Sequence, residues 1–145
     1  MILRRILFVV RLALGAIFIY AAWTKLRQNW LIFAMSIDSY HLLPEWAVLT
    51  LGRTLPWFEL LIGILLMLGY KLRYVATAAS ALLLVFFAAM LRSYFVGQGI
   101  DCGCFGLGEA ISPRTLVRDG SLLAAAILLA VSAFTRGRRE ALASK

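Results

Sequence analysis

The stretch ILFVVRLALGAIFIYAAW, from Ile6 to Trp23, contains a single charged side chain, Arg11. A helix needs about 20 apolar residues to cross the roughly 30 Å hydrocarbon core of a bilayer, and this stretch is close to that length. The Arg4-Arg5 pair before it resembles the start of a signal peptide. The apolar run, however, continues to Trp23-Thr24-Lys25 without a small-x-small cleavage site. We therefore expect a retained membrane span.

Three further apolar segments of similar length follow: 47–70, 74–95 and 115–134. The last follows Ser112-Pro113, a pair typical of a helix N-cap with proline at the first helical position. The chain has 145 residues, of which 63% are hydrophobic and 15% charged, a composition too apolar for an ordinary soluble domain. The sequence predicts an all-α polytopic membrane protein: a four-transmembrane-helix bundle in a single domain, 1–145, with spans at about 6–23, 47–70, 74–95 and 115–134.

Two parts of this pattern are less regular. Pro56 interrupts the second segment, so it either kinks that helix or begins its membrane-crossing part, with a boundary near Thr54 as the alternative. Residues 29–44 mix aromatic and aliphatic side chains with Asp38 and His41. That mixture suits a short interfacial helix in the headgroup layer between spans 1 and 2.

The charge balance favours lipid over nucleic acid as a partner. The chain has 15 Lys and Arg against 7 Asp and Glu, a net charge of +8, and the basic residues flank the apolar runs. No RNP-type, zinc-finger or helix-turn-helix pattern accompanies them, so we expect no nucleic acid partner.

The basic residues also predict an orientation, because loops rich in Lys and Arg stay in the cytoplasm. On the side of the termini lie Arg4, Arg5, Lys71, Arg73, Arg136, Arg138, Arg139 and Lys145, and on the opposite side Lys25, Arg27, Arg92 and Arg114. We expect cytoplasmic termini in a bacterial-type inner membrane. The loop between the last two spans would then be extracytoplasmic, where disulfides form and persist.

That loop contains the stretch DCGCFG, residues 101–106, with both cysteines of the chain. A zinc or iron–sulfur site needs about four Cys or His ligands. The chain offers only Cys102, Cys104 and its single histidine, so a metal site within this chain would be incomplete. Buried cysteines acting as small hydrophobes are common, but this glycine-rich loop gains nothing from burial. A disulfide across Cys-Gly-Cys closes a small strained ring, made reachable by Gly103, and strain favours thiol exchange over stapling.

Several short motifs occur in order along the chain. They are Arg11 and Lys25 in and after the first span, YHLLP at 40–44, PWFEL at 56–60 and DCGCFG at 101–106. Together they resemble the MauE branch of the DoxX-like membrane proteins over nearly the whole chain. The resemblance implies a four-helix membrane protein of redox maturation. It also implies a link to methylamine utilisation, in which a disulfide-rich dehydrogenase subunit is matured in the periplasm alongside a thioredoxin-like partner.

Ionisable residues within spans are functional candidates because burying charge in hydrocarbon is unfavourable. Glu59 follows Pro56 by one turn and lies near the level of Lys25, so the two residues either form a structural ion pair or act on the thiols. In the second case Glu59 accepts a proton, and Lys25 or Arg118 stabilises the thiolate. Arg118 and Asp119 either line the same pocket or pair with each other. Arg11 either snorkels to the interface or has an interior role.

The sequence thus predicts a thiol–disulfide exchange protein. Cys102, Cys104 and Glu59 are its candidate catalytic residues, and Lys25, Arg118, Asp101, Gly103 and Pro56 are the supporting ones. The expected partners are a thioredoxin-like extracytoplasmic protein, the lipid bilayer and other membrane subunits. The direction of electron flow stays open.

Two alternatives and one cofactor are left open. The main rival is a non-enzymatic scaffold or accessory subunit of a redox complex, and a transporter is weaker because no inverted repeat is evident. No cofactor is certain. A quinone bound between aromatic residues competes with the simpler reading of those residues as an interfacial belt. The aromatic residues concerned are Trp23, Trp30, Trp46, Trp57 and Tyr94.

Overall fold

The computed structural model describes residues 2–97, 99 and 109–143, except the side chains of 139–141 and 143. These residues form five α-helices: α1 Ile2–Arg27, α2 Trp30–Asp38, α3 Glu45–Leu68, α4 Leu72–Val96 and α5 Pro113–Ala143. Four are long and apolar enough to cross a membrane: Ile2–Arg27, Glu45–Leu68, Leu72–Val96 and Pro113–Arg138. No strand occurs in the described part of the chain. The predicted polytopic helical bundle, with a short helix between its first two spans, is confirmed.

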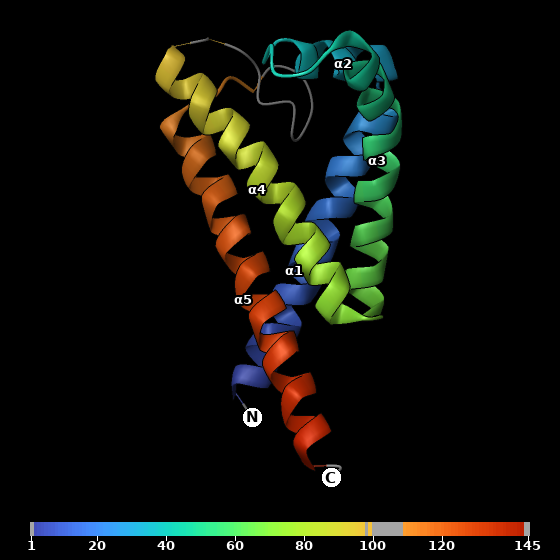
Figure 1. Ribbon diagram of the computed structural model, residues 1–145, viewed down its shortest axis with the longest axis vertical. Helices are drawn as coiled ribbons and strands as arrows, with labels where there is room; N and C mark the ends of the chain where they lie inside the picture. The colour runs from blue at the N-terminus through green and yellow to red at the C-terminus, as the bar shows by residue number, and fades with distance from the viewer. Residues whose placement is uncertain (1, 98, 100–108, 144–145) are drawn as a thin grey trace.

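The four long helices form two pairs that spread apart toward one end (Figure 1). α1 lies beside α3, and α4 lies beside α5; the pairs converge toward the end that holds both termini and diverge toward the end where α2 crosses. The buried core lies where the pairs converge. Its members are Leu14, Phe18, Leu66, Val75, Ala76, Ala79, Ala126, Leu129 and Ala130.

The helix ends follow the local sequence. Ser112 caps α5: the Thr115 backbone N–H donates to Ser112 Oγ at 3.3 Å, and Ser112 N–H donates to Thr115 Oγ1 at 2.9 Å. Pro113 is the first helical residue, so the predicted cap is confirmed. α3 ends at Leu68 and is capped by Gly69, which has a left-handed φ of 72° and whose N–H donates to the carbonyls of Leu65 and Leu66.

Arg11 reaches this same end of α3. Its Nη2 donates to the Met67 carbonyl at 3.5 Å, and its guanidinium lies where a side chain on residue 69 would have to go. The cation therefore complements the partial negative charge at a helix C-terminus.

Pro56 lies within α3 and is buried, and the helix runs unbroken from Glu45 to Leu68. The alternative boundary near Thr54 is wrong. α3 begins directly after Pro44. Pro56 removes a single backbone N–H from the helix, a loss that membrane helices tolerate where neighbouring groups or local adjustments compensate.

Two glycines bring α1 and α3 into close contact. A Cβ added to Gly63 would lie 2.7 Å from Ile19 Cγ1 and 2.9 Å from the Gly15 carbonyl oxygen, and one added to Gly15 would lie 3.0 Å from the Gly63 carbonyl oxygen. Small residues at facing positions let membrane helices pack backbone to backbone. This contact sets the spacing of the first helix pair.

Gly63→Ala should therefore destabilise the fold by about 1–3 kcal/mol, because the added methyl group has to push α1 away from α3. The matched control is Gly120→Ala, where a Cβ would meet the Phe87 ring at 3.5 Å, an ordinary contact. Thermal unfolding of the purified protein in detergent measures both variants. Equal stabilities would show that the α1–α3 contact is not tight.

Candidate functional site

A buried ion pair joins α1 to α3. Lys25 Nζ, in the last turn of α1, donates to Glu59 Oε1 at 2.6 Å and to Oε2 at 2.7 Å. The two residues are only 3% and 4% exposed. The structure thus brings together two residues that the sequence had suggested as partners, because each charge compensates for the burial of the other.

Aromatic rings from two further helices surround the ammonium group. Lys25 Nζ lies 4.9 Å from the centroid of the Phe33 ring in α2 and 5.6 Å from that of Phe86 in α4. Both distances are within the range of cation–π attraction. The ion pair therefore lies where α1, α2, α3 and α4 meet, with both carboxylate oxygens already occupied by the lysine.

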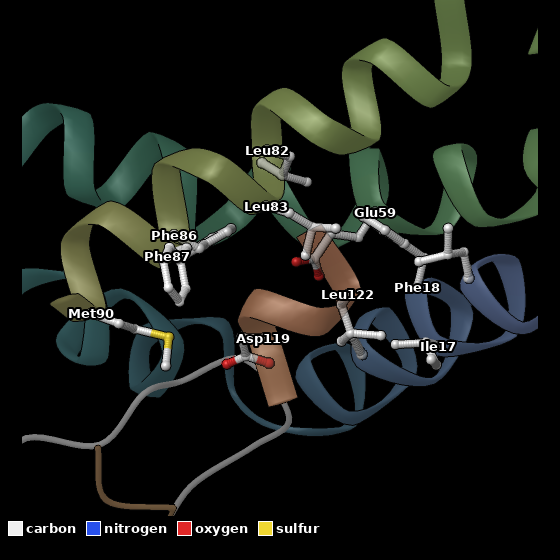
Figure 2. Close-up of a pocket in the computed structure, with 12 residues that line it drawn as sticks. Ile17, Phe18, Glu59, Leu82, Leu83, Phe86, Phe87, Met90, Asp119 and Leu122 are labelled. Carbon is white, nitrogen blue, oxygen red and sulfur yellow. The ribbon is translucent and has the colours of Figure 1, made fainter. Parts of the chain in front are cut away.

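Glu59 also lines a pocket between the two helix pairs. Asp119, from the second turn of α5, lines the same pocket and is 6% exposed. Figure 2 shows Glu59 extending from α3 and Asp119 from the start of α5, with Phe86, Phe87, Met90 and Leu122 among the other lining side chains. The pocket has a volume of about 40 Å³. Its described lining side chains are apolar except for Glu59 and Asp119. The volume exceeds the roughly 10–15 Å³ that one water needs, and these two carboxylates are the polar groups that such a water would contact.

Arg118 connects this pocket with the chain that precedes α5. Its Nη1 donates to Glu109 Oε1 at 2.6 Å, and its Nε and Nη2 donate to Asp119 Oδ1 and Oδ2 at 3.1 and 3.3 Å. Asp119 pairs with Arg118, which is one of the two alternatives that the sequence had offered, and it also lines the pocket of Glu59. A pocket shared with the thiols stays a prediction, because the cysteines lie outside the described residues. Arg118 forms the bridge and is not among the residues that line the pocket.

The remaining predicted site residues fall into two groups. Asp101, Cys102, Gly103 and Cys104 lie outside the described residues. Pro56 is buried in α3 one turn before Glu59 and does not line the pocket. No group of three or more His, Cys, Asp or Glu residues that could hold a metal ion occurs among the described residues.

The sequence did not single out Glu109. It is the first described residue after segment 100–108, and its carboxylate binds Arg118 across nine positions. No helical period joins two residues at that separation. The one local signal is that Glu109 is the only acidic residue between Asp101 and Asp119.

A second, larger hollow adjoins the pocket. It is an apolar groove of about 460 Å³ formed by α2, the segment after α2, α3 and α4, and Arg92 is the one charged residue among its lining side chains. Leu82 and Phe86 line both spaces. The groove has the volume usual for small-molecule sites.

Comparison with known proteins gives a consistent result. A family model described as "Methylamine utilisation protein MauE" matches residues 3–132. A methylamine utilization protein MauE from Paracoccus denitrificans is 33% identical over 128 residues, which cover 86% of this chain and 68% of that protein. One from Methylorubrum extorquens is 33% identical over 113 residues, which cover 76% of this chain and 60% of that protein. No solved structure matches the chain.

The buried ion pair generates a stability prediction. Lys25→Met or Glu59→Met alone should destabilise the protein by about 3–5 kcal/mol, because each leaves an unpaired charge in the interior. The double variant Lys25→Met/Glu59→Met should recover most of that loss. Thermal unfolding in detergent measures the cycle, with Arg27→Met, an exposed cation in the same helical turn, as the control. Additive losses in the double variant would show that the two residues are not coupled.

Proposed function

The chain belongs to the family of methylamine utilisation protein MauE, and from this premise we propose that it is a membrane thiol–disulfide redox protein. It exchanges electrons with a thioredoxin-like extracytoplasmic protein through Cys102 and Cys104. The exchange supports the maturation of extracytoplasmic redox proteins, as in methylamine utilisation.

The observation that carries this proposal is the chain of contacts from Glu109 through Arg118 to Asp119. Glu109 follows the segment that contains both cysteines, and Asp119 shares a pocket with Glu59. These contacts link Glu109, the residue directly after the cysteine segment in the sequence, to the pocket of Glu59 and Asp119. A thiol-exchange site needs such groups to take up and return protons.

The proposed exchange is balanced in atoms and electrons. A thiolate of the partner attacks one sulfur of the Cys102–Cys104 disulfide, the bond between the two cysteines breaks, and a mixed disulfide forms. The second thiolate of the partner then attacks the mixed disulfide and releases the other cysteine. The partner loses two electrons and two protons, and the Cys102–Cys104 pair gains them. The same steps in reverse pass reducing equivalents outward, and no third reactant is required.

Each charged residue has a distinct role in this proposal. Glu59 accepts a proton from the exchanging thiols by way of the pocket that it shares with Asp119. Arg118 is better suited than Lys25 to stabilise a thiolate, because its side chain is 34% exposed whereas that of Lys25 is 2% exposed. Lys25 holds Glu59 in place. Gly103 gives the ring its backbone freedom, Asp101 flanks it, and Pro56 fixes the turn that carries Glu59.

The distribution of basic residues supports an orientation for this site. We propose that the cysteine segment is extracytoplasmic and that both termini are cytoplasmic, in a bacterial-type inner membrane. Arg4, Arg5, Lys71, Arg73 and the arginines at the end of α5 lie on the side of the termini.

Trapping of the partner tests the exchange. Cys104→Ser leaves Cys102 as the only thiol of the chain, and its thiolate attacks the disulfide of an oxidised thioredoxin-like protein. Without Cys104 to resolve the mixed disulfide, a reducible adduct should accumulate in the membrane fraction. Mass spectrometry of bands separated without reductant identifies the adduct. The control is Cys102→Ser/Cys104→Ser, which should give none. Absence of the adduct, together with normal complex assembly by the cysteine-free double variant, would replace this proposal with the scaffold role.

The Lys25 and Glu59 variants separate a chemical role from a structural one. Because Lys25→Met/Glu59→Met restores stability without restoring an acid, its rate of thiol exchange per folded molecule should stay about 100-fold or more below that of the wild type. Stopped-flow mixing with a reduced thioredoxin-like protein measures the rate. A double variant that exchanges at the wild-type rate would leave Glu59 as a structural pairing residue only.

A further inference from the structure

We propose that a basic pocket at the end of the bundle that holds the termini binds the phosphate of an anionic phospholipid. The pocket lies between the first turn of α4 and the last part of α5, and its volume is about 370 Å³. Its lining residues are Lys71, Leu72, Arg73, Tyr74, Ala133, Arg136 and Gly137. The site is at the other end of the bundle from α2 and is independent of the proposed thiol chemistry (Figure 1).

Charge is the first argument for an anionic ligand. Lys71, Arg73 and Arg136 all line the pocket, and no acidic residue does. None of the three forms an ion pair with any side chain that the structure describes. By contrast, Lys25 and Arg118 at the other end are both neutralised by carboxylates. The positive charge of the pocket is therefore available to a ligand.

The backbone adds to this charge. Lys71 is the N-cap residue of α4 and has a left-handed φ of 41°, and no side chain caps the helix. No acidic residue lies in its first turn. The uncapped N–H groups and the partial positive charge of a helix N-terminus favour an anion, above all a phosphate. The N-terminus of a 25-residue helix and three cationic side chains thus converge on one pocket.

Gly137 provides the space for this arrangement. A Cβ at this position would lie 3.0 Å from Arg73 Nη1 and 3.2 Å from Arg73 Cζ. The side chain of Arg73 therefore lies against the backbone of α5, which brings it toward the same pocket as Arg136. A larger residue at position 137 would displace the Arg73 guanidinium without altering any charge.

The position of the pocket identifies a lipid as the source of the phosphate. Tyr70 and Tyr74 beside it are 58% and 64% exposed, as is typical of the aromatic belt at headgroup level. The same part of α5 exposes Val131 and Phe134 to the surroundings, as expected of a helix in contact with acyl chains. Basic pockets between membrane helices at this depth bind anionic headgroups. A phospholipid with a net negative charge matches the pocket better than a zwitterionic one.

Native mass spectrometry of the full chain, released from nanodiscs of equal parts phosphatidylglycerol and phosphatidylcholine, tests the site. The wild type should retain phosphatidylglycerol in preference to phosphatidylcholine. Arg73→Gln should lower that retention about fivefold and Arg73→Gln/Arg136→Gln about 25-fold, since one Lys or Arg near a membrane surface contributes about 1 kcal/mol. Gly137→Leu should lower it with no change of charge, because a side chain of that size has to displace the Arg73 guanidinium.

The control is Arg27→Gln, which removes an exposed cation at the opposite end and should leave retention unchanged. Thermal unfolding of each variant confirms that it is folded. An equal loss with Arg27→Gln, or no loss with Gly137→Leu, would mean that the lipid is attracted by the overall charge of the protein and is not bound in this pocket. Displacement of the lipid by millimolar inorganic phosphate would show that the pocket binds a soluble anion and would overturn the lipid as its ligand. Equal retention of the two lipids by the wild type would overturn the proposal outright.

Discussion

The buried Lys25–Glu59 ion pair is the constraint on which the rest of the bundle depends. In hydrocarbon neither charge is tolerated alone, so the end of α1 must lie at the level of Glu59 in α3. That requirement sets how far the two helices can slide past each other. The Gly15–Gly63 contact sets how closely they approach. Together a polar and a steric restraint define the first helix pair.

The second helix pair, α4 and α5, forms the other side of the pocket that Glu59 lines. α4 and α5 meet α1 and α3 in the buried core but diverge from them toward α2 (Figure 1). The pocket that contains Glu59 and Asp119 is lined by residues of both pairs. Phe86 of α4 approaches the ammonium group of Lys25 and lines both the pocket and the neighbouring groove. The pocket and the neighbouring groove thus lie where the pairs diverge, and the Phe86 ring keeps α4 in contact with the Lys25–Glu59 ion pair.

The two ends of the bundle differ in how their charges are satisfied. Toward α2, Lys25 and Arg118 are paired with carboxylates, and Arg118 lies in a short network with Glu109 and Asp119. At the end of the termini, Arg11 binds the end of α3, while Lys71, Arg73 and Arg136 gather without carboxylate partners among the described side chains. Proton chemistry suits the first arrangement, and binding of an external anion suits the second. The proposed exchange site and the proposed lipid site therefore occupy opposite ends of one small protein.

The sequence by itself determined the membrane spans, the short helix between the first two, and the Ser112-Pro113 start of α5, because hydropathy and capping depend on residues close together in the chain. It also suggested Lys25 and Glu59 as partners, since charges at one level of a membrane tend to pair. It did not decide whether α3 continues through Pro56. The Glu109–Arg118 contact, the shared pocket of Glu59 and Asp119, and the meeting of Arg73 with Gly137 emerged only in the tertiary structure. Each of them joins residues without a common helical period or from different helices, so helix packing, which no local pattern encodes, decides which side chains meet.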